Sequence, residues 1–279
     1  MGITLKAIQT LQDKSILTAA TKALLDVGSS NLYQATPLGI LEFLRAFGVS
    51  QDDASTAFAE KLAHGSAYDS VSGGKNEAFV GELFEKAGIR YEAIDIADGY
   101  RTTIVDLNHQ GAPLWFRNAF DVVLNFGTTE HLLNQFNAFR VIHDCVRVGG
   151  YMVHSLPCVG YTNHGYLAYT PRCFFDLAGY NGYEVVHFEY EGPGGANDLA
   201  RPLQDYATYF PALSEAAEKM ENRKGALASV GNILDISLFI IMRKVHEKPF
   251  LGALETTTSV GKIPDSVDAK YKHNNIIKS

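Results

Sequence analysis

The sequence lacks the features that mark membrane, secreted and nucleic-acid-binding proteins. No apolar run reaches the roughly 18–20 residues that a membrane span needs. The first residues lack a basic segment followed by an apolar one, so we expect no signal peptide and a cytoplasmic protein. The formal net charge is −7, and no Lys/Arg cluster stands out. We therefore expect neither a nucleic acid nor a membrane as partner.

Cysteine and the common motifs of metal and phosphate sites are equally scarce. The three cysteines, Cys145, Cys158 and Cys173, have no CxxC spacing, which favours reduced thiols over a disulfide framework. HExxH and DxD patterns are missing, and so are GxSxG and a GKS/T phosphate loop. The sequence therefore predicts no metal site, and it favours neither a hydrolase nor a P-loop enzyme.

Short apolar runs alternate with longer stretches of helical periodicity, as in βαβ units with a mainly parallel sheet. Between residues 130 and 148 apolar side chains recur at three-to-four spacing, which predicts a helix that Gly149 and Gly150 terminate. A second helix is expected from Pro171 to the Asn181-Gly182 pair. The expected strands are Ala23–Val27, Arg90–Ile94, Thr103–Val105, Asp121–Asn125, Tyr151–Ser155, Tyr183–Glu189 and Ile236–Arg243.

Other regions fall outside this alternation, within what we expect to be a single domain over residues 1–279. Residues 1–22 resemble an amphipathic helix. Residues 35–89 form a mostly helical insertion with a polar, glycine-rich part at 70–75. Residues 191–231 form a second insertion with a helix around 212–222, and residues 249–279 form a polar tail. The two insertions are expected to build a lid or an acceptor pocket.

A glycine turn and two acidic residues follow three of the expected strands. Gly28 allows a ligand to approach the backbone closely, and the turn after the first strand of an open α/β sheet is where ligands bind. Asp95 ends the next strand, where a carboxylate can accept both hydroxyl protons of a ribose, and Asp106 follows the third. Each feature also has an ordinary structural explanation, because buried strands often enter glycine turns and carboxylates often cap turns.

Residues 120–157 carry the most specific pattern. It comprises Phe120-Asp121-Val122-Val123, Glu130-His131, Arg147-Val148-Gly149-Gly150 and Pro157. This segment resembles the second half of class I S-adenosylmethionine (SAM)-dependent methyltransferases, and residues 164–186 and 236–243 continue the resemblance. It covers roughly residues 23–34 and 90–245. The resemblance implies a doubly wound, Rossmann-like fold with a mainly parallel seven-stranded sheet and an antiparallel last strand. It also implies SAM as cofactor and S-adenosylhomocysteine as product.

The resemblance also implies a set of cofactor contacts. The matching residues are Asp26, Gly28 and Ser29 for the methionine part of SAM, Asp95 for the ribose, Asp106 and Leu107 for the adenine, and Asn125, Phe126 and Gly127 beside the sulfonium. Tyr33 lies just past the glycine turn and would cover the cofactor. Two departures stand out: Ser30 replaces the second glycine of the family's motif, and the gap between Gly28 and Asp95 is far longer than one helix.

Histidine is the natural base near neutral pH, and a methyl acceptor that carries a proton needs one. His164 is the preferred catalytic base because it follows the fifth strand, and His131 is the second candidate. The alternatives are an exposed loop histidine at 164 and a histidine packed at a helix start at 131. Acceptor contacts are expected from Glu130, His154, Tyr161, Tyr166 and Tyr169, although His154 also fits a core position and the tyrosines could simply pack the loop.

The sequence thus favours a SAM-dependent methyltransferase that acts on a small molecule. Whether oxygen, nitrogen or carbon is methylated stays open, as does assembly into a homo-oligomer. Two rival functions remain. One is a Rossmann-type nucleotide-dependent oxidoreductase, disfavoured because GxGxxG is missing. The other is a catalytically silent SAM-fold subunit, which Ser30 and the long insertion allow.

Overall fold

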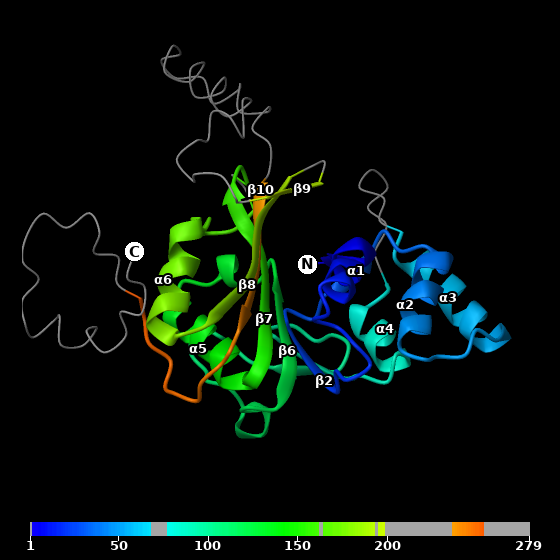
Figure 1. The fold of residues 1–279 in the computed structure, drawn as a ribbon, viewed down its shortest axis with the longest axis horizontal. Helices are drawn as coiled ribbons and strands as arrows, with labels where there is room; N and C mark the ends of the chain where they lie inside the picture. The colour runs from blue at the N-terminus through cyan, green and yellow to red at the C-terminus, as the bar shows by residue number, and fades with distance from the viewer. Residues whose placement is uncertain (1, 68–76, 162–163, 193–194, 199–235, 254–279) are drawn as a thin grey trace, which may run out of the picture.

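The fold is an eight-stranded sheet between two layers of helices (Figure 1). It is seen in a computed structural model that describes residues 2–67, 77–161, 164–192, 195–198 and 236–253. Across the sheet the strands are β5 (Thr102–Ile104), β4 (Arg90–Asp95), β2 (Ala23–Val27), β6 (Phe120–Phe126), β7 (Val146–Val159), β10 (Ile236–Arg243), β8 (Glu184–Gly192) and β9 (Gly195–Asp198). Among the described residues, no helix has the length and apolar character to cross a bilayer.

The predicted fold class is confirmed by this topology. Strands β5, β4, β2, β6 and β7 are parallel, and β10 lies antiparallel between β7 and β8. All seven expected strands are present. The eighth, β9, pairs antiparallel with β8 and was not predicted. Its sequence, Gly-Ala-Asn-Asp, has no apolar alternation, so only its partner strand makes it a strand.

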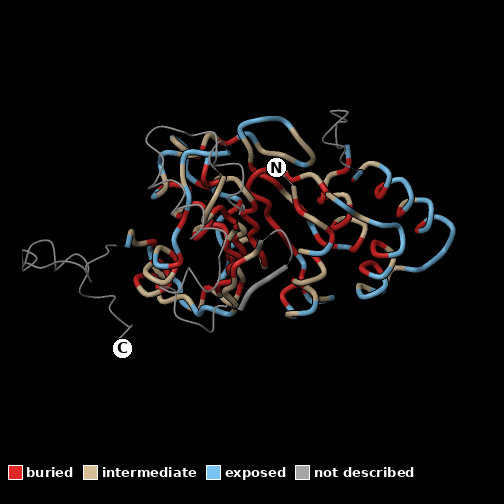
Figure 2. Tube along the Cα trace, turned by 90° about the horizontal axis from the view of Figure 1, so that it is seen from above, coloured by how far each residue is buried: buried red, intermediate tan, exposed pale blue. Residues whose placement is uncertain are grey.

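The two helical layers follow from the alternation of side chains along the strands. On β2, Leu24 packs into the core formed with α1 (Leu5–Asp13), α2 (Pro37–Ala46), α3 (Asp53–Gly65) and α4 (Val80–Lys86), whereas Leu25 packs into the core formed with α5 (Gln135–Cys145) and α6 (Pro171–Asn181). A strand that is buried on both faces is apolar at nearly every position, and Asp26 is the one exception on β2. Figure 2 shows the buried residues gathered in the sheet and the helices facing it.

The long helix predicted for residues 130–148 is wrong at both ends. Residues Thr129–His131 form a short 3-10 helix, and α5 begins only after Asn134, whose side chain accepts a hydrogen bond from the backbone N–H of Asn137. The helix ends at Cys145 because Val146 already pairs with Phe120 in the sheet. Pairing along the sheet therefore ended the helix before the glycines. The end of α6 at Gly182, which has φ +63°, agrees with the prediction.

The long gap between Gly28 and Asp95 is explained by a segment that closes on itself. Asn31 forms an antiparallel bridge with Phe79, and the N–H of Val80 donates to the carbonyl of Ser30 at 3.1 Å. Residues 31–79 thus leave and rejoin the chain at one place, and α4 then leads into β4. The insertion therefore spans 31–79 rather than 35–89, and α4 belongs to the βαβ unit.

At the N-terminus the expected helix is shorter than predicted. Strand β1 (Gly2–Thr4) comes first and pairs parallel with β3 (Asn31–Tyr33), and α1 then runs only from Leu5 to Asp13. The expected features at residues 70–75, at 212–222 and in the tail beyond residue 253 lie outside the described residues.

A buried lysine joins three segments at the bottom of the sheet. The Lys244 side chain is 1% exposed, and its Nζ donates to the Asn118 side chain and to the carbonyls of His143 and Val146, at 3.0–3.2 Å. This ammonium therefore hydrogen-bonds one carbonyl at the end of α5 and one at the start of β7, where the helix passes directly into the strand.

We expect Lys244→Met to lower the free energy of unfolding by about 3 kcal/mol, because it removes the donor to two buried carbonyls, those of His143 and Val146, and the cation that pairs with Glu247. Urea unfolding measures this change. Lys61→Met, at an exposed position of α3, is the matched control and should change the free energy by less than about 0.5 kcal/mol. Equal effects of the two substitutions would contradict the structural role of Lys244.

Candidate functional site

The carboxyl ends of the parallel strands bring the predicted cofactor residues to one edge of the sheet. Val27 pairs with Ile94, Asp95 pairs with Ile104, and Asp26 pairs with Leu124. The turn after β2, Asp95 at the end of β4, the loop after β5 and the loop after β6 therefore follow one another along this edge. Ligands bind at this edge of open α/β sheets.

Asp26 lies beneath the turn after β2. Its carboxylate is fully buried and accepts hydrogen bonds from the Ser30 backbone N–H (2.7 Å), the Ser30 hydroxyl (3.2 Å) and the Tyr91 hydroxyl (2.9 Å). Burial raises the pKa of Asp26, although these bonds favour its charged form. The carboxylate thus shapes the turn from inside the protein. Ser30, where the resemblance leads one to expect a glycine, uses both its N–H and its hydroxyl in this network.

The turn itself presents backbone rather than side chains. Gly28 has φ +125°, a conformation that other residues rarely adopt, and its N–H donates to the carbonyl of Ile94 at 2.8 Å. The Ser29 hydroxyl bonds the Thr102 hydroxyl at 2.9 Å. Gly99 packs so closely on Ser29 that an added Cβ would lie 2.2 Å from the Ser29 Oγ. The turn is therefore held tightly against the loop after β4.

The two strand-end acids are half-buried. Asp95 accepts a bond from the Ala97 N–H at 3.0 Å, and Asp106 accepts one from the Asn108 N–H at 2.9 Å. Leu107 is buried beside Asp106. A glycine turn without a side chain, followed by carboxylates at the ends of neighbouring strands, fits a nucleoside ligand with a polar tail.

A cavity of about 200 Å³ opens beside the loop after β6. Its walls come from the ends of β6, β7 and β10, from the loop after β7 and from β1. The lining residues are Gly2, Phe126, Gly127, Glu130, Ser155, Pro157, Tyr161, His164 and Ser237. Phe126 and Gly127 belong both to this cavity and to the predicted cofactor loop. The Thr128 hydroxyl bonds the carbonyl of Val27, which joins that loop to the end of β2.

A buried glutamate, Glu130, and His164 line this cavity, and His131 lies beside Glu130. The Glu130 side chain is 0% exposed, and its Oε1 lies 3.2 Å from the His164 Nε2 and 3.9 Å from the His131 Nε2. The two histidine side chains are 43% and 40% exposed. Burial raises the pKa of Glu130 while His164 opposes that rise, and burial together with His164 lowers the pKa of His131. The fold thus joins both predicted catalytic histidines to one carboxylate.

His154 takes a different position from the one predicted for it. Its ring packs between Phe139 and Phe174 with centroids 5.7 and 5.4 Å away, and its Nδ1 lies 3.1 Å from the Asn125 side-chain nitrogen. Burial lowers the pKa of His154 to about 3, so the ring is neutral. The neighbouring Ser155 lines the cavity instead, because successive residues of a strand point to opposite faces.

The predicted tyrosines also separate. Tyr161 lines the cavity and its hydroxyl lies 2.6 Å from that of Ser237. Tyr166 is exposed, and Tyr169 is buried towards the α5–α6 layer. The Tyr33 ring lies against Gly2, another cavity residue. Sequence reasoning missed Gly2, Ser155 and Ser237, since no motif marks them.

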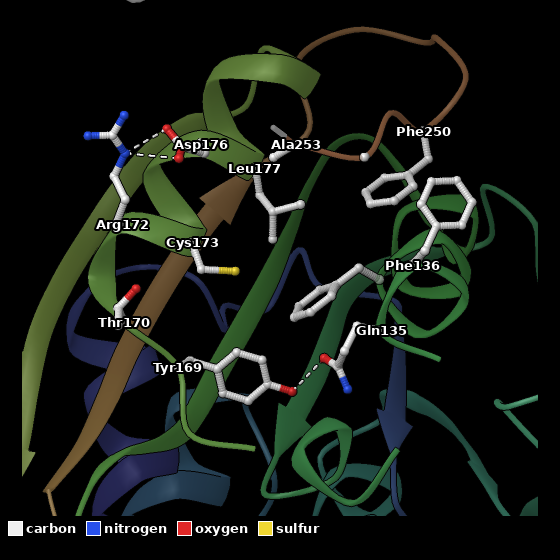
Figure 3. Close-up of a pocket in the computed structure, with 12 residues that line it drawn as sticks. Gln135, Phe136, Tyr169, Thr170, Arg172, Cys173, Asp176, Leu177, Phe250 and Ala253 are labelled. Atoms are coloured by element: carbon white, nitrogen blue, oxygen red, sulfur yellow. Dashed lines mark hydrogen bonds and ion pairs between the residues drawn. The ribbon is translucent and has the colours of Figure 1, made fainter. Parts of the chain in front are cut away.

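A larger apolar cavity, of about 450 Å³, lies between α5, α6 and residues 250–253 (Figure 3). Its apolar lining includes Phe136, Phe139, Leu177 and Phe250. Its polar groups already bond one another: the Tyr169 hydroxyl donates to the Gln135 side chain at 2.7 Å, and Arg172 pairs with Asp176. The polar chemistry is therefore concentrated at the smaller cavity.

No family profile and no curated protein matches the sequence. Among solved structures, the fold is similar to phosphoethanolamine N-methyltransferase 2 of Haemonchus contortus in complex with S-adenosyl-L-methionine, with 12% identity, 86% of this chain and 52% of that chain covered, and a TM-score of 0.42. A SAM-dependent methyltransferase from Archaeoglobus fulgidus matches with 12% identity, 86% and 94% coverage, and a TM-score of 0.42. A protein of Bacillus halodurans described as a methyltransferase matches with 11% identity, 85% and 97% coverage, and a TM-score of 0.46. The chain spans about half the length of the Haemonchus enzyme.

The buried Asp26 should leave a signature in the pH dependence of stability. Because its folded-state pKa is raised, its contribution is greatest below the unfolded-state pKa and is lost as the pH rises through the folded-state pKa. Asp26→Asn removes this titration while keeping the shape. The free energy of unfolding of the variant, minus that of the wild type, should therefore increase from pH 4 to pH 8 in urea titrations.

The matched control is Asp52→Asn at the start of α3. The Ser55 N–H lowers the pKa of Asp52, so this difference should change with pH in the opposite sense. If the difference for Asp26→Asn is flat or falls with pH, the pKa of Asp26 is not raised in the folded protein.

Proposed function

We propose that the chain is a SAM-dependent methyltransferase that transfers a methyl group to a small-molecule acceptor. The observation that carries this proposal is the shared position of Phe126 and Gly127. They belong to the loop expected beside the reactive end of the cofactor, and they also form a wall of the cavity around Glu130. Methyl donor and acceptor must meet within contact distance for an in-line transfer, and this loop is where they would meet.

We propose that different residues at this edge of the sheet bind different parts of SAM. We assign the methionine part to the backbone of Gly28 and Ser29, the ribose hydroxyls to Asp95, and the adenine to Asp106 and Leu107. Asp26 supports the turn from beneath, and Asn125 holds the loop that begins at Gly127 through its hydrogen bond to the Thr129 hydroxyl at 3.0 Å. When bound, SAM supplies an electrophilic methyl group on a sulfonium centre.

The acceptor side is assigned to the smaller cavity. A volume of about 200 Å³ admits the reacting end of a small molecule. The chain contributes alignment of that end and exclusion of water, which are the main needs of a methyl transfer. Glu130 and His164 contact the reacting group, and Tyr161 and Ser155 contact its surroundings. The base role of His164 stays a prediction.

The insertion formed by residues 31–79 is proposed to wall the cofactor edge. Its two ends meet directly after the Gly28 turn, where Asn31 pairs with Phe79. Movement of these ends would therefore also move Ser30 and Val80. Most of the segment at 191–231, which was expected to contribute to a lid or an acceptor pocket, lies outside the described residues. We propose that the reaction takes place in the cytoplasm.

The first test is isothermal titration of the full chain with SAM, S-adenosylhomocysteine and NAD(H). We expect micromolar binding of the two sulfur ligands. Asp95→Ala should weaken both by about 10- to 100-fold, because it removes one or two charge-assisted hydrogen bonds to the ribose. Asp13→Ala, an equal charge change at an exposed position at the end of α1, should leave both affinities unchanged.

The rival functions give different results in the same experiment. Binding of NAD(H) without SAM would replace the proposal with a nucleotide-dependent oxidoreductase. Binding of SAM with no methyl transfer to any acceptor would instead indicate a silent binding subunit. If a folded chain binds neither sulfur ligand, the assigned cofactor site is wrong.

A further inference from the structure

We propose that Glu130, His131 and His164 form a binding site for one divalent transition-metal ion of the zinc class at the mouth of the smaller cavity. The acceptor role that we give this ion rests on the methyl transfer proposed above, whereas the ion site itself does not. Sequence motifs predicted no metal, because His164 lies far along the chain from Glu130 and His131. The fold alone joins the three.

The distances suit a single ion. The Glu130 Oε1 lies 3.2 Å from the His164 Nε2 and 3.9 Å from the His131 Nε2, and the three ligand atoms lie within 4.8 Å of one another. Bonds of about 2.0–2.1 Å in a tetrahedral site place neighbouring ligand atoms about 3.3 Å apart. The Glu130–His164 pair already has this separation. Both histidine rings are partly exposed, so rotation of His131 completes the site.

The burial and the incomplete hydrogen bonding of the Glu130 carboxylate favour a bound cation. Its side chain is 0% exposed, and among the described residues its Oε2 has no hydrogen-bond partner. A buried carboxylate oxygen without a partner is costly, and such groups usually pair with a charge or coordinate a metal. The imidazole at 3.2 Å serves Oε1 only. A cation beside Oε1 would neutralise the carboxylate that the fold buries here.

The backbone holds Glu130 and His164 together independently of any ion. The Glu130 carbonyl accepts bonds from the N–H groups of Tyr166 (2.9 Å) and Leu167 (3.2 Å). Gly165 packs directly on Glu130, since an added Cβ would lie 2.8 Å from the Glu130 Cγ and 3.1 Å from its carbonyl oxygen. The loop that carries His164 is therefore fastened to Glu130. Preorganised ligands of this kind are what a metal site requires.

The donor set selects the class of metal. Two imidazole nitrogens and one carboxylate oxygen suit zinc and its neighbours among the transition metals, whereas magnesium and calcium prefer oxygen ligands alone. Three protein ligands leave a position open, as in catalytic zinc sites. The wall of the cavity beside Glu130 and His164 carries the polar groups of Ser155, Tyr161 and Ser237.

This site would select an acceptor that offers an oxygen, such as an alcohol or a phenol. A metal ion makes a bound hydroxyl more acidic, so the proton leaves to solvent and the oxygen becomes a better nucleophile. In the transfer the oxygen forms a bond to the methyl carbon and the carbon–sulfur bond breaks. The electron pair of that bond stays on sulfur, which becomes a neutral thioether. In this arrangement His164 is a ligand and not a free base.

The test is titration of ZnCl₂ into the tag-free full chain after removal of metals with a chelating resin. We expect one equivalent to bind with a Kd of about 1 μM or below. Glu130→Gln, His131→Ala and His164→Ala should each weaken binding at least about tenfold, since each removes a ligand. His109→Ala, at an exposed histidine, is the matched control and should bind as the wild type does.

CoCl₂ provides a second readout that does not depend on activity. A tetrahedral site with nitrogen and oxygen ligands should give strong visible absorption in the wild type and in His109→Ala, and this absorption should vanish in Glu130→Gln. Circular dichroism establishes that each variant is folded. Glu130→Gln preserves the side-chain shape, so loss of metal binding by a folded variant reports the ligand.

Zinc binding and SAM binding test the metal site and the proposed function separately. Stoichiometric zinc binding that the ligand variants lose supports the site even if SAM does not bind. Absence of stoichiometric binding, or binding that Glu130→Gln and His164→Ala leave unchanged, overturns it. SAM affinity, measured on the same samples, then reports separately on the methyltransferase proposal.

Discussion

The hydrogen bonds around the Asp26 carboxylate are the constraint on which the ligand edge depends. One carboxylate, fully buried, binds the backbone and hydroxyl of Ser30 and the hydroxyl of Tyr91, and so joins β2, the turn after it and β4. These three donors offset part of the cost of burying the charged form, although burial still raises the pKa of Asp26. Because Ser30 is held in this way, the Gly28 turn keeps its left-handed backbone and the insertion at 31–79 closes at the same point.

The position of the cavity follows from the same arrangement. The loop after β6 is joined to β2 through the Thr128 hydroxyl, and Gly127 bonds the carbonyl of Ser155 on β7 at 3.0 Å. The ends of three neighbouring strands are thereby joined beside the Gly28 turn. The fold then places an incompletely satisfied glutamate, Glu130, in the wall. Buried polar groups without partners are rare in native proteins and concentrate at functional sites.

Much of the fold was predictable because the strands are buried on both faces. Strands β2 and β10 were predicted to the residue, since short runs that are mostly apolar leave few alternatives. Helix ends were predicted less well. Glycines at 149 and 150 suggested a stop, but pairing of Val146 with Phe120 ended α5 earlier. Tertiary pairing overrides local signals where both compete for the same residues.

The candidate site was also predicted only in part. By itself the sequence determined the residues at the strand ends, Gly28, Asp95 and Asp106, because the order of parallel strands carries them to one edge. Only the tertiary structure decided that His164 meets Glu130, since this contact depends on how closely the loop packs at Gly165. It likewise decided that Ser155, and not His154, lines the cavity. The reason is physical: strand order is encoded in local patterns, whereas contacts between distant segments depend on how side chains pack.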